Sequence, residues 1–251
     1  MAWSLDNILL TLLSMVIPSL LLYIVHLFRE LIPTRRFWRI KGDKILIVAS
    51  WANEGKCDSK ELSQTTYKPE MVGTANVFSM IERVYKTSPD ISLSTPNNKD
   101  LQGDIVVIGG PITNLVAGQI FEMDHIPFYF GESDRRSLTN KKTGKIFKPK
   151  KDSSNAFVAE DYAIVLNTTN PFDENHRAII ISGCMGIGTE CACKLASNLQ
   201  QTGKAQRKIK RFVKRNPKKS FYFILKIESV FGSYGNPVVV DMGTFNFKME
   251  G

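Results

Sequence analysis

Cysteine and histidine are scarce in this chain of 251 residues, which contains four cysteines and three histidines. Cys57 stands alone, Cys191 and Cys193 are too close together for an ordinary disulfide, and no histidine completes a zinc-ligand spacing with them. These absences argue against a disulfide framework and against a metal site or a metal cofactor. Such sparse cysteine is typical of a reducing compartment.

Charged residues are absent from Ile8 to Phe28, a run of 21 mostly apolar residues. As a helix this run is roughly 30 Å long, the thickness of the hydrocarbon core of a bilayer. The alternative is a secretory signal peptide, which we disfavour because the preceding residues include Asp6 but no lysine or arginine, and no small-residue cleavage site follows. The sequence therefore predicts a retained transmembrane anchor within residues 1–30.

The two flanks of this apolar run differ in charge. Only Asp6 precedes it, whereas residues 29–44 include six lysines or arginines against two acids. Positive flanks stay on the cytoplasmic side, so we expect a single-pass protein of the cell membrane whose soluble domain is cytoplasmic. Phe37 and Trp38 fall in the predicted juxtamembrane linker, 31–43, and are expected near the membrane interface, where aromatic side chains gather.

Acids are also absent from residues 204–219, which hold nine lysines or arginines in 16 residues. Because the net charge of the chain is +9, the remainder sums to about zero. Such a block has three interpretations: a solvated linker or helix face, a surface for anionic lipid, or a surface for nucleic acid.

We favour lipid over nucleic acid because the predicted anchor already holds the domain at the membrane. Ile209, Phe212 and Val213 would also give an interfacial helix its apolar stripe. The residues assigned to the membrane surface are Arg35, Arg36, Arg39, Lys208, Lys210, Arg211, Lys214 and Arg215.

Short apolar runs alternate with segments of helical periodicity through residues 44–251. Helices are expected from near Gly73 and from about Ile112. The alternation predicts an α/β fold, with a Rossmann-like mixed sheet that carries helices on both faces. Polar, lysine-rich residues near 131–156 predict a hairpin insertion in this domain.

Two of the predicted strands run directly into glycine turns that precede helices. The segments are DIVVIGGPITN at 104–114 and IIISGCMGIGT at 179–189. In open α/β sheets, ligands bind outside the carboxyl ends of the strands, where glycines let a phosphate approach the backbone and helix N-termini offer free amides. Asn167–Pro171 would lie at the same edge if its strand is parallel to these two.

The glycine turns therefore predict a site for a nucleotide or another phosphorylated ligand. A plainer interpretation stays open, because the spacing matches neither the Rossmann pattern nor a P-loop, and glycines also permit tight turns and close helix packing. The predicted ligand-binding residues are Gly109, Gly110, Thr113, Asn114, Gly183, Gly186, Gly188 and Thr189.

Two residues near the second turn are weak candidates for catalysis. Cys184 lies at a predicted helix N-terminus, a position that favours the thiolate, but a nucleophilic cysteine needs a base. Only His125 and His176 are available in the soluble part. Glu190 is a single carboxylate without an evident partner. Cys191 and Cys193 are expected to be small packed residues of a helix.

The apolar run at 8–28 and the two strand–glycine–helix segments together resemble the membrane-anchored effectors of prokaryotic nucleotide-signalled defence systems. Those effectors join membrane helices to a cytosolic Rossmann-like ligand-sensing domain. The resemblance implies a nucleotide second messenger as ligand and self-association in the membrane as output. The pieces GGPITN and ISGCMGIGTECA also look like segments of microbial cell-envelope domains, which the charged flanks oppose.

We therefore predict a membrane-anchored, self-associating protein whose cytoplasmic domain binds a nucleotide or other phosphorylated ligand and signals to the membrane helix or to a partner. Membrane lipid is a second expected partner. One alternative is a membrane-tethered enzyme that acts on a nucleotide or cofactor through Glu190 or Cys184. Another is an anchored structural module that binds anionic lipid or polyanions.

Overall fold

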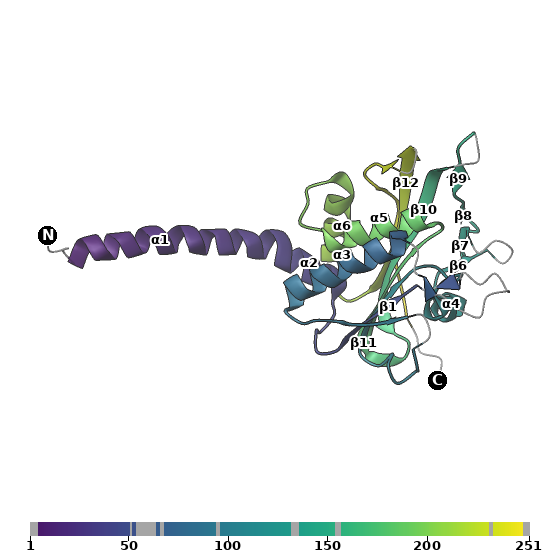
Figure 1. Cartoon of the computed structure of the whole chain (residues 1–251), viewed down its shortest axis with the longest axis horizontal. Coiled ribbons are helices and arrows are strands. Elements are labelled where there is room, and N and C mark those ends of the chain that lie inside the picture. The colour runs from purple at the N-terminus through teal and green to yellow at the C-terminus, as the bar shows by residue number, and fades with distance from the viewer. Residues whose placement is uncertain are drawn as a thin grey trace.

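The chain forms a projecting N-terminal helix and an α/β body in the computed structural model (Figure 1). The structure describes residues 5–50, 52–53, 64–65, 68–93, 96–131, 136–153, 157–230 and 233–247. Cys57 lies outside these residues.

The N-terminal helix is nearly continuous over its whole length. It begins as α1 (Leu5–His26), passes through a π-helical turn, η1 (Leu27–Leu31), and continues as α2 (Ile32–Trp38). The stretch Ser14–Trp38 is long and apolar enough to cross a membrane, a test of length and composition that a signal sequence near the N-terminus also passes. Large apolar side chains are exposed along it, including Leu20–Val25.

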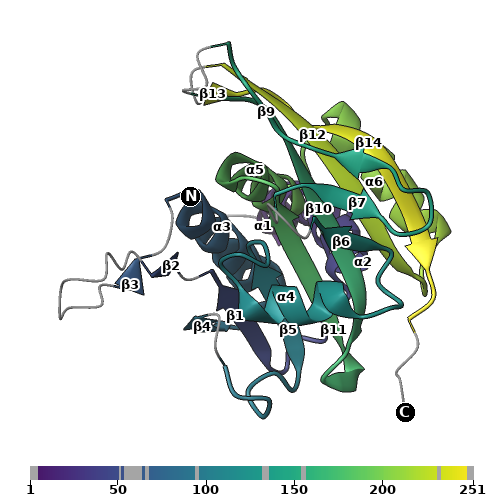
Figure 2. The same cartoon turned by 90° about the vertical axis from the view of Figure 1, so that its right-hand side faces the viewer.

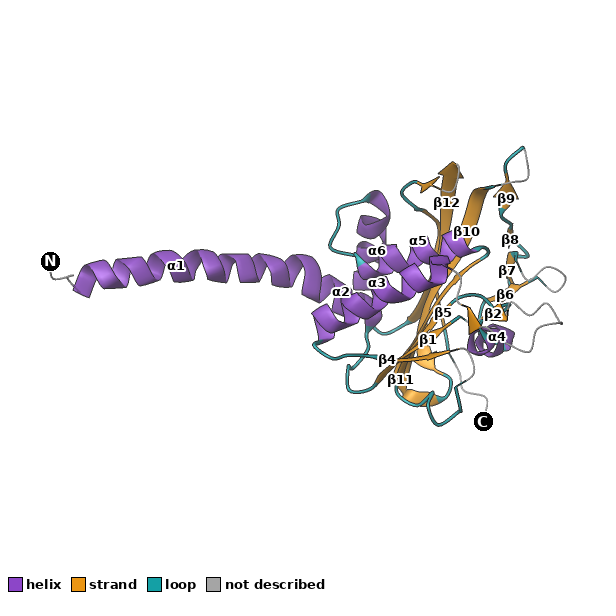
Figure 3. Cartoon of the chain, in the orientation of Figure 1, coloured by secondary structure: helices purple, strands orange, loops and turns teal. Residues whose placement is uncertain are grey.

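A curled, mixed sheet forms the centre of the body (Figures 1 and 3). Its main path runs β13–β12–β10–β11–β5–β1–β4, with β14 paired to β12 and β9 paired to β10. The four strands β4, β1, β5 and β11 are parallel, and β10, β12 and β14 join them antiparallel. The bounds are β1 Ile45–Ala49, β4 Asp90–Leu93, β5 Asp104–Ile108, β9 Lys150–Lys151, β10 Val158–Asn170, β11 Asp173–Gly183, β12 Ser220–Val230, β13 Ser233–Tyr234 and β14 Val238–Phe245. The predicted mixed α/β sheet is confirmed.

Helices cover the face of the sheet that is turned toward the N-terminal helix (Figure 3). They are α2, α3 (Lys68–Tyr85), α5 (Gly186–Ser197) and α6 (Lys204–Arg215), whose apolar residues form one buried cluster with that face. Ile45 and Ile47 of β1 point into this cluster. Alternate strand residues point to opposite faces, so the fully buried run ILIVA serves both layers.

The other face of the sheet carries a single helix and a small sheet (Figure 2). Leu46 and Val48 of β1 point into this second buried cluster. The elements are α4 (Leu115–Glu122) and the strands β6 (Phe128–Phe130), β7 (Leu138–Asn140) and β8 (Ile146–Phe147). The predicted insertion at 131–156 therefore contributes β7, β8 and β9, while 132–135 and 154–156 lie outside the described residues. A two-stranded ladder, β2 (Ala52–Asn53) with β3 (Gln64–Thr65), follows β1.

Both predicted helix starts differ from the observed ones. α3 begins at Lys68, five residues before Gly73, because Pro69 and Glu70 suit the first turn of a helix. α4 begins at Leu115 rather than Ile112, because Asn114 is extended and its side chain caps the helix.

The segment Asn167–Pro171 lies at the sheet edge opposite to the glycine turns. β10 runs antiparallel to β11, so the carboxyl end of β10 meets the amino end of its neighbour. Asn170 there donates hydrogen bonds to the carbonyls of Leu101 and Gly103, both at 2.8 Å. This segment is therefore excluded from the predicted site.

Phe37 and Trp38 lie in the core rather than at a membrane interface. Their side chains are only 1% and 0% exposed. Trp38 Nε1 donates a hydrogen bond to the carbonyl of Ala196, at 3.1 Å, and Phe37 packs on Phe221 and Phe223. The expectation of interfacial aromatics was wrong because α2 packs against the body, where these rings bury more apolar area.

Candidate functional site

The two glycine turns lie side by side at the carboxyl edge of the parallel strands. β5 and β11 are parallel neighbours, so their turns leave the sheet at the same edge. The amide of Gly109 donates to the carbonyl of Ile181 at 2.9 Å, and the hydroxyl of Ser182 donates to the carbonyl of Gly109 at 2.6 Å. The two turns are therefore hydrogen-bonded neighbours at one edge of the sheet.

A pocket of about 330 Å³ opens between these turns. Its volume is near the lower end of the range for small-molecule sites, roughly 300–1,000 Å³. It brings together the predicted residues Gly110, Thr113, Gly183, Gly186 and Cys184. The residues that complete its lining are Pro69, Glu70, Ile112, Arg136, Val158, Met185 and Ile187.

Gly109 and Asn114 hold the first turn in place instead of lining the pocket. Gly109 has a φ of +109°, and a Cβ atom there would lie 1.6 Å from the hydroxyl of Ser50. Asn114 is fully buried, and its side chain donates to the carbonyls of Val48 and Ile108 at 3.1 and 3.0 Å. Both residues therefore have a structural explanation.

The N-terminus of α5 is occupied by a carboxylate of the protein itself. Asp161, in the neighbouring strand β10, accepts hydrogen bonds from the amides of Met185 at 3.1 Å and Gly188 at 2.6 Å. It also accepts one from the amide of Tyr162 at 2.7 Å. The expectation of free amides in the first turn of α5 is wrong for Gly188, because a buried acid already accepts from it and from the amide of the N-cap residue Met185.

Close packing explains two glycines and the threonine of the second turn. A Cβ atom at Gly188 would lie 2.7 Å from Asp161 Oδ2, and one at Gly183 would lie 2.3 Å from the carbonyl of Met185. The amide of Gly183 donates to Thr189 Oγ1 at 2.9 Å. Thr189 and Gly188 are buried and do not line the pocket, so Gly183 and Gly186 are the two predicted ligand-binding residues of this turn that do.

Glu70 is the site residue that the sequence analysis missed. Its side chain is 6% exposed, and its Oε2 atom has no hydrogen-bond partner within the described part of the chain. That oxygen would lie 3.7 Å from a Cβ atom at Gly186, beside the pocket. The pair Pro69–Glu70, typical of the first turn of a helix, was the sequence signal that could have placed Glu70 at this end of α3.

Burial governs the ionisation of both acids at this edge. It raises the pKa of the Glu70 carboxyl, partly offset by a hydrogen bond to its own backbone, and the charge of Glu190 adds to the rise. Burial also raises the pKa of Asp161 to about 7, although the amides of Gly188, Tyr162 and Met185 lower it in part. Glu70 therefore makes the pocket wall acidic beside α3, and its Oε2 atom, without a partner among the described residues, suits a ligand that brings an N–H donor.

The pocket also has a cationic side. Arg136, which is exposed, lines it together with Gly110 and the hydroxyl-bearing Thr113. Thr113 Oγ1 donates to the hydroxyl of Ser50 at 3.1 Å. The arrangement can therefore receive a ligand with a donor-rich part and an anionic part, on Glu70 and Arg136 respectively.

The two candidates for catalysis lie in different surroundings. Cys184 lines the pocket but is buried, and its thiol faces the carbonyl of Phe147 at 3.7 Å. Glu190 lies outside the pocket lining, where Lys194 at 2.7 Å and Tyr234 at 2.8 Å both donate to it. His176 pairs with Asp173 at the opposite end of β11.

The cysteines of α5 behave as packed residues. Cys193 is fully buried, and its sulfur would lie 3.0 Å from a Cβ atom at Gly73 of α3. Burial raises the pKa of Cys191 to about 12 and that of Cys193 well above its ordinary value. The expectation that both are small packed residues is confirmed. Among the residues that the structure describes, no group of three acids, histidines or cysteines could hold a metal ion.

The basic residues expected at a membrane surface divide into two groups. Arg39 is tied to the body, because its guanidinium donates to the carbonyls of Lys219 at 2.7 Å and Asn216 at 2.6 Å and lies over Phe221. Lys208 reaches the carbonyl of Val239 at 3.0 Å. The residues that are mostly exposed are Arg35, Arg36, Arg211, Lys214 and Arg215, with Lys210 partly covered.

The apolar stripe of α6 faces the core and not a lipid surface. Ile209 and Val213 are buried, and Phe212 packs on Phe223 with ring centroids 5.5 Å apart. The expectation of an interfacial helix was wrong, because these residues complete the helical layer of the body. The cations of α6 remain on its outer side.

Two helices run from the pocket to the N-terminal helix. α3 begins at the pocket and ends beside η1 and α2, where Arg83 donates to Glu30 at 2.5 Å and Arg35 donates to the carbonyl of Val84 at 3.0 Å. α5 also begins at the pocket and ends where Trp38 contacts Ala196. The helices α3 and α5 therefore connect the pocket to the N-terminal helix.

Comparison with protein-family models, curated proteins and solved structures finds no match to this chain.

Proposed function

We propose that this protein is a single-pass membrane protein whose Rossmann-like cytoplasmic domain binds a nucleotide and passes the bound state to its membrane helix. The observation that carries the proposal is the path of α3 and α5 between the pocket and the N-terminal helix. A ligand between Glu70 and Gly186 touches the beginnings of both helices. Their far ends hold Glu30 and Trp38.

The chemistry of the pocket supports a nucleotide more than a simple phosphate. The unpartnered Oε2 atom of Glu70 matches the N–H edge of a base, and Arg136 matches a phosphate. A free phosphate would gain less, because it brings no N–H donor to Glu70 and because Asp161 already occupies the amides of Met185 and Gly188. The ligand therefore contributes the donors that Glu70 lacks, and recognition depends on the base as well as the charge.

The membrane part of the proposal rests on the apolar helix and its flanks. One copy of a helix without charged residues between Ile8 and Phe28 cannot line a polar pore. We therefore propose that the occupied domain changes self-association in the membrane, as the resemblance to nucleotide-signalled effectors implies. The lack of charge leaves packing between copies as the driving force.

Thermal unfolding of the full-length protein in nanodiscs, with a panel of mono-, di-, tri- and cyclic nucleotides, tests the proposal. A ligand at 100 times its dissociation constant adds about 2.7 kcal/mol of apparent stability. Glu70→Gln should lower the affinity for the nucleotide that stabilises the protein at least tenfold. The matched control Glu190→Gln, whose residue lies outside the pocket, should respond like the unmodified protein. A flat response across the whole panel would overturn the proposal.

A further inference from the structure

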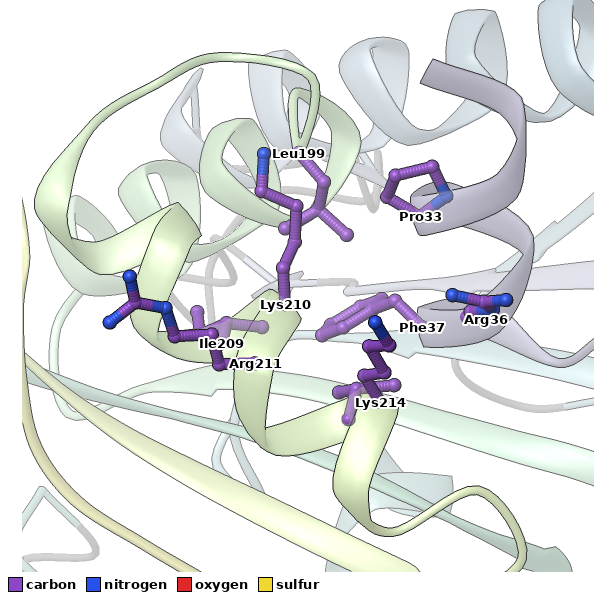
Figure 4. Close-up of a pocket in the computed structure, with 9 residues that line it drawn as sticks. Pro33, Arg36, Phe37, Leu199, Ile209, Lys210, Arg211 and Lys214 are labelled. Carbon is purple, nitrogen blue, oxygen red and sulfur yellow. The ribbon is translucent and has the colours of Figure 1, made fainter. Parts of the chain in front are cut away.

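A groove of about 200 Å³ separates α2 from α6 (Figure 4). Its lining is partly apolar, and three of its cations lie around it: Arg36 and Lys214 near Phe37, and Lys210, which extends toward Leu199. Arg211 lines it too but points away from the other three. The groove residues are Pro33, Arg36, Phe37, Leu199, Ile209, Lys210, Arg211, Val213 and Lys214, with no acid among them.

Within the described part of the chain, three cations of the groove have no acidic partner. The ion pairs found among the described residues include none of Arg36, Lys210 and Lys214. Burial lowers the pKa of Lys210, and the charges of Arg29 and Arg207 lower it further. An anion in the groove would relieve this repulsion between like charges.

The groove lies close to the end of the apolar run. Arg29 directly follows Phe28, and its charge acts on Lys210, so the groove and the end of the run share one electrostatic neighbourhood. Arg36 is about 12 Å further along a helix axis than Phe28, at a rise of roughly 1.5 Å per residue. The headgroup layer of a bilayer is roughly 5–8 Å thick on each side. Long side chains from α6 therefore span the distance between the body and that layer.

We propose that the α2–α6 groove binds the phosphate of an anionic phospholipid from the leaflet at which α1 ends. The cations of the groove hold the phosphate, and the acyl chains stay in the bilayer. This inference rests on the membrane placement of α1 in the proposed function, but not on the nucleotide pocket.

Lipid binding by the full-length protein in detergent can be measured by native mass spectrometry, with dioleoylphosphatidylglycerol and dioleoylphosphatidylcholine as probes. Phosphatidylglycerol should bind at least tenfold more tightly than phosphatidylcholine. The double variant Lys210→Gln, Lys214→Gln should lose roughly tenfold in affinity for phosphatidylglycerol, because each cation near an anionic lipid contributes severalfold.

The charge-matched control is Lys204→Gln, Arg215→Gln, which removes two cations that line a different cleft on the other side of α6. Its affinity should stay within twofold to threefold of the unmodified protein. Equal losses of lipid affinity in both double variants would mean that the lipid is attracted by the overall charge, and would overturn the proposal of a binding groove. Thermal unfolding of each variant checks that the fold is retained.

Two further measurements distinguish a lipid phosphate from a free phosphate, and the lipid proposal from the nucleotide proposal. Glycerol phosphate and inorganic phosphate should not displace the lipid at equal concentration, because they lack the acyl chains that keep a lipid in the detergent micelle around α1. Displacement by either would overturn lipid as the occupant. Glu70→Gln should leave the lipid preference unchanged, so a failed nucleotide screen with an intact lipid preference would reject only the sensing proposal.

Discussion

The carboxylate of Asp161 accepts a hydrogen bond from the amide of Gly188 at 2.6 Å, across 27 residues of sequence. It therefore caps α5 from the adjacent strand β10. This contact changes the chemistry of the site, since the positive end of the α5 dipole is matched by the protein and not by a ligand. It also leaves Glu70 as the pocket group that still needs a partner.

Replacing Asp161 with alanine should destabilise the protein by about 2 kcal/mol or more. The change removes a helix cap, which is worth roughly 0.5–2 kcal/mol, and strands buried amides at Met185 and Gly188. Chemical denaturation at pH 6 measures it, below the folded-state pKa of about 7, because the stability linked to the raised pKa of Asp161 is lost as the pH rises through that value. Asp90→Ala, at an exposed position of β4, is the control and should change stability by less than about 0.5 kcal/mol. An equal effect of the two changes would contradict the capping role.

Replacing Glu70 with glutamine should stabilise the protein above neutral pH, by on the order of 1 kcal/mol, because it removes an unpaired buried charge. Burial raises the pKa of Glu70 in the folded state, so the folded protein binds the proton more tightly than the unfolded chain. The stability that this proton contributes is present at low pH and is lost as the pH rises.

The test for Glu70 is the difference in unfolding free energy between Glu70→Gln and the unmodified protein at several pH values. The difference should be small near pH 4, below the ordinary pKa of a glutamate, and should grow toward pH 8. A difference that shrinks as the pH rises would mean that Glu70 is stabilised as an anion.

Gly109→Ala should cost more stability than Gly144→Ala. Both glycines have positive φ angles, +109° and +68°, so both substitutions strain the backbone. Only at Gly109 would the new Cβ atom meet another group, Ser50 Oγ at 1.6 Å, whereas nothing lies within 4 Å at Gly144. We expect about 1 kcal/mol for Gly144→Ala and at least twice that for Gly109→Ala, measured by denaturation. Equal costs would show that the turn relaxes around the methyl group.

The Arg83–Glu30 contact should couple α3 to the N-terminal helix. A double-mutant cycle with Arg83→Met and Glu30→Gln should give about 1 kcal/mol of coupling, since Glu30 is largely covered and Arg83 partly so. Hydrogen exchange of η1 should respond to the nucleotide in the unmodified protein and not in Arg83→Met. Preserved transmission in that variant would show that α5 alone carries the signal.

Local sequence patterns were enough to predict the elements with strong signals. The uncharged run at Ile8–Phe28 is helical, and the β-branched runs of β1, β5 and β11 form buried strands. Such runs are readable from the sequence because an apolar segment gains free energy when its side chains leave water. The two glycine turns were also predictable as strand-to-helix corners. Their adjacency followed once the strands were parallel neighbours.

Tertiary structure decided how the available groups are used. Local patterns could not show that Asp161 fills the N-terminus of α5, that Ile209 and Val213 face the core, or that Phe37 and Trp38 are buried. Each outcome depends on a partner far away in sequence. The free energy of a hydrogen bond or of apolar burial is gained only when those partners meet in the folded protein. One stretch of sequence therefore specifies a helix or a turn, but it does not specify which amide, carboxylate or aromatic ring stays available to a ligand.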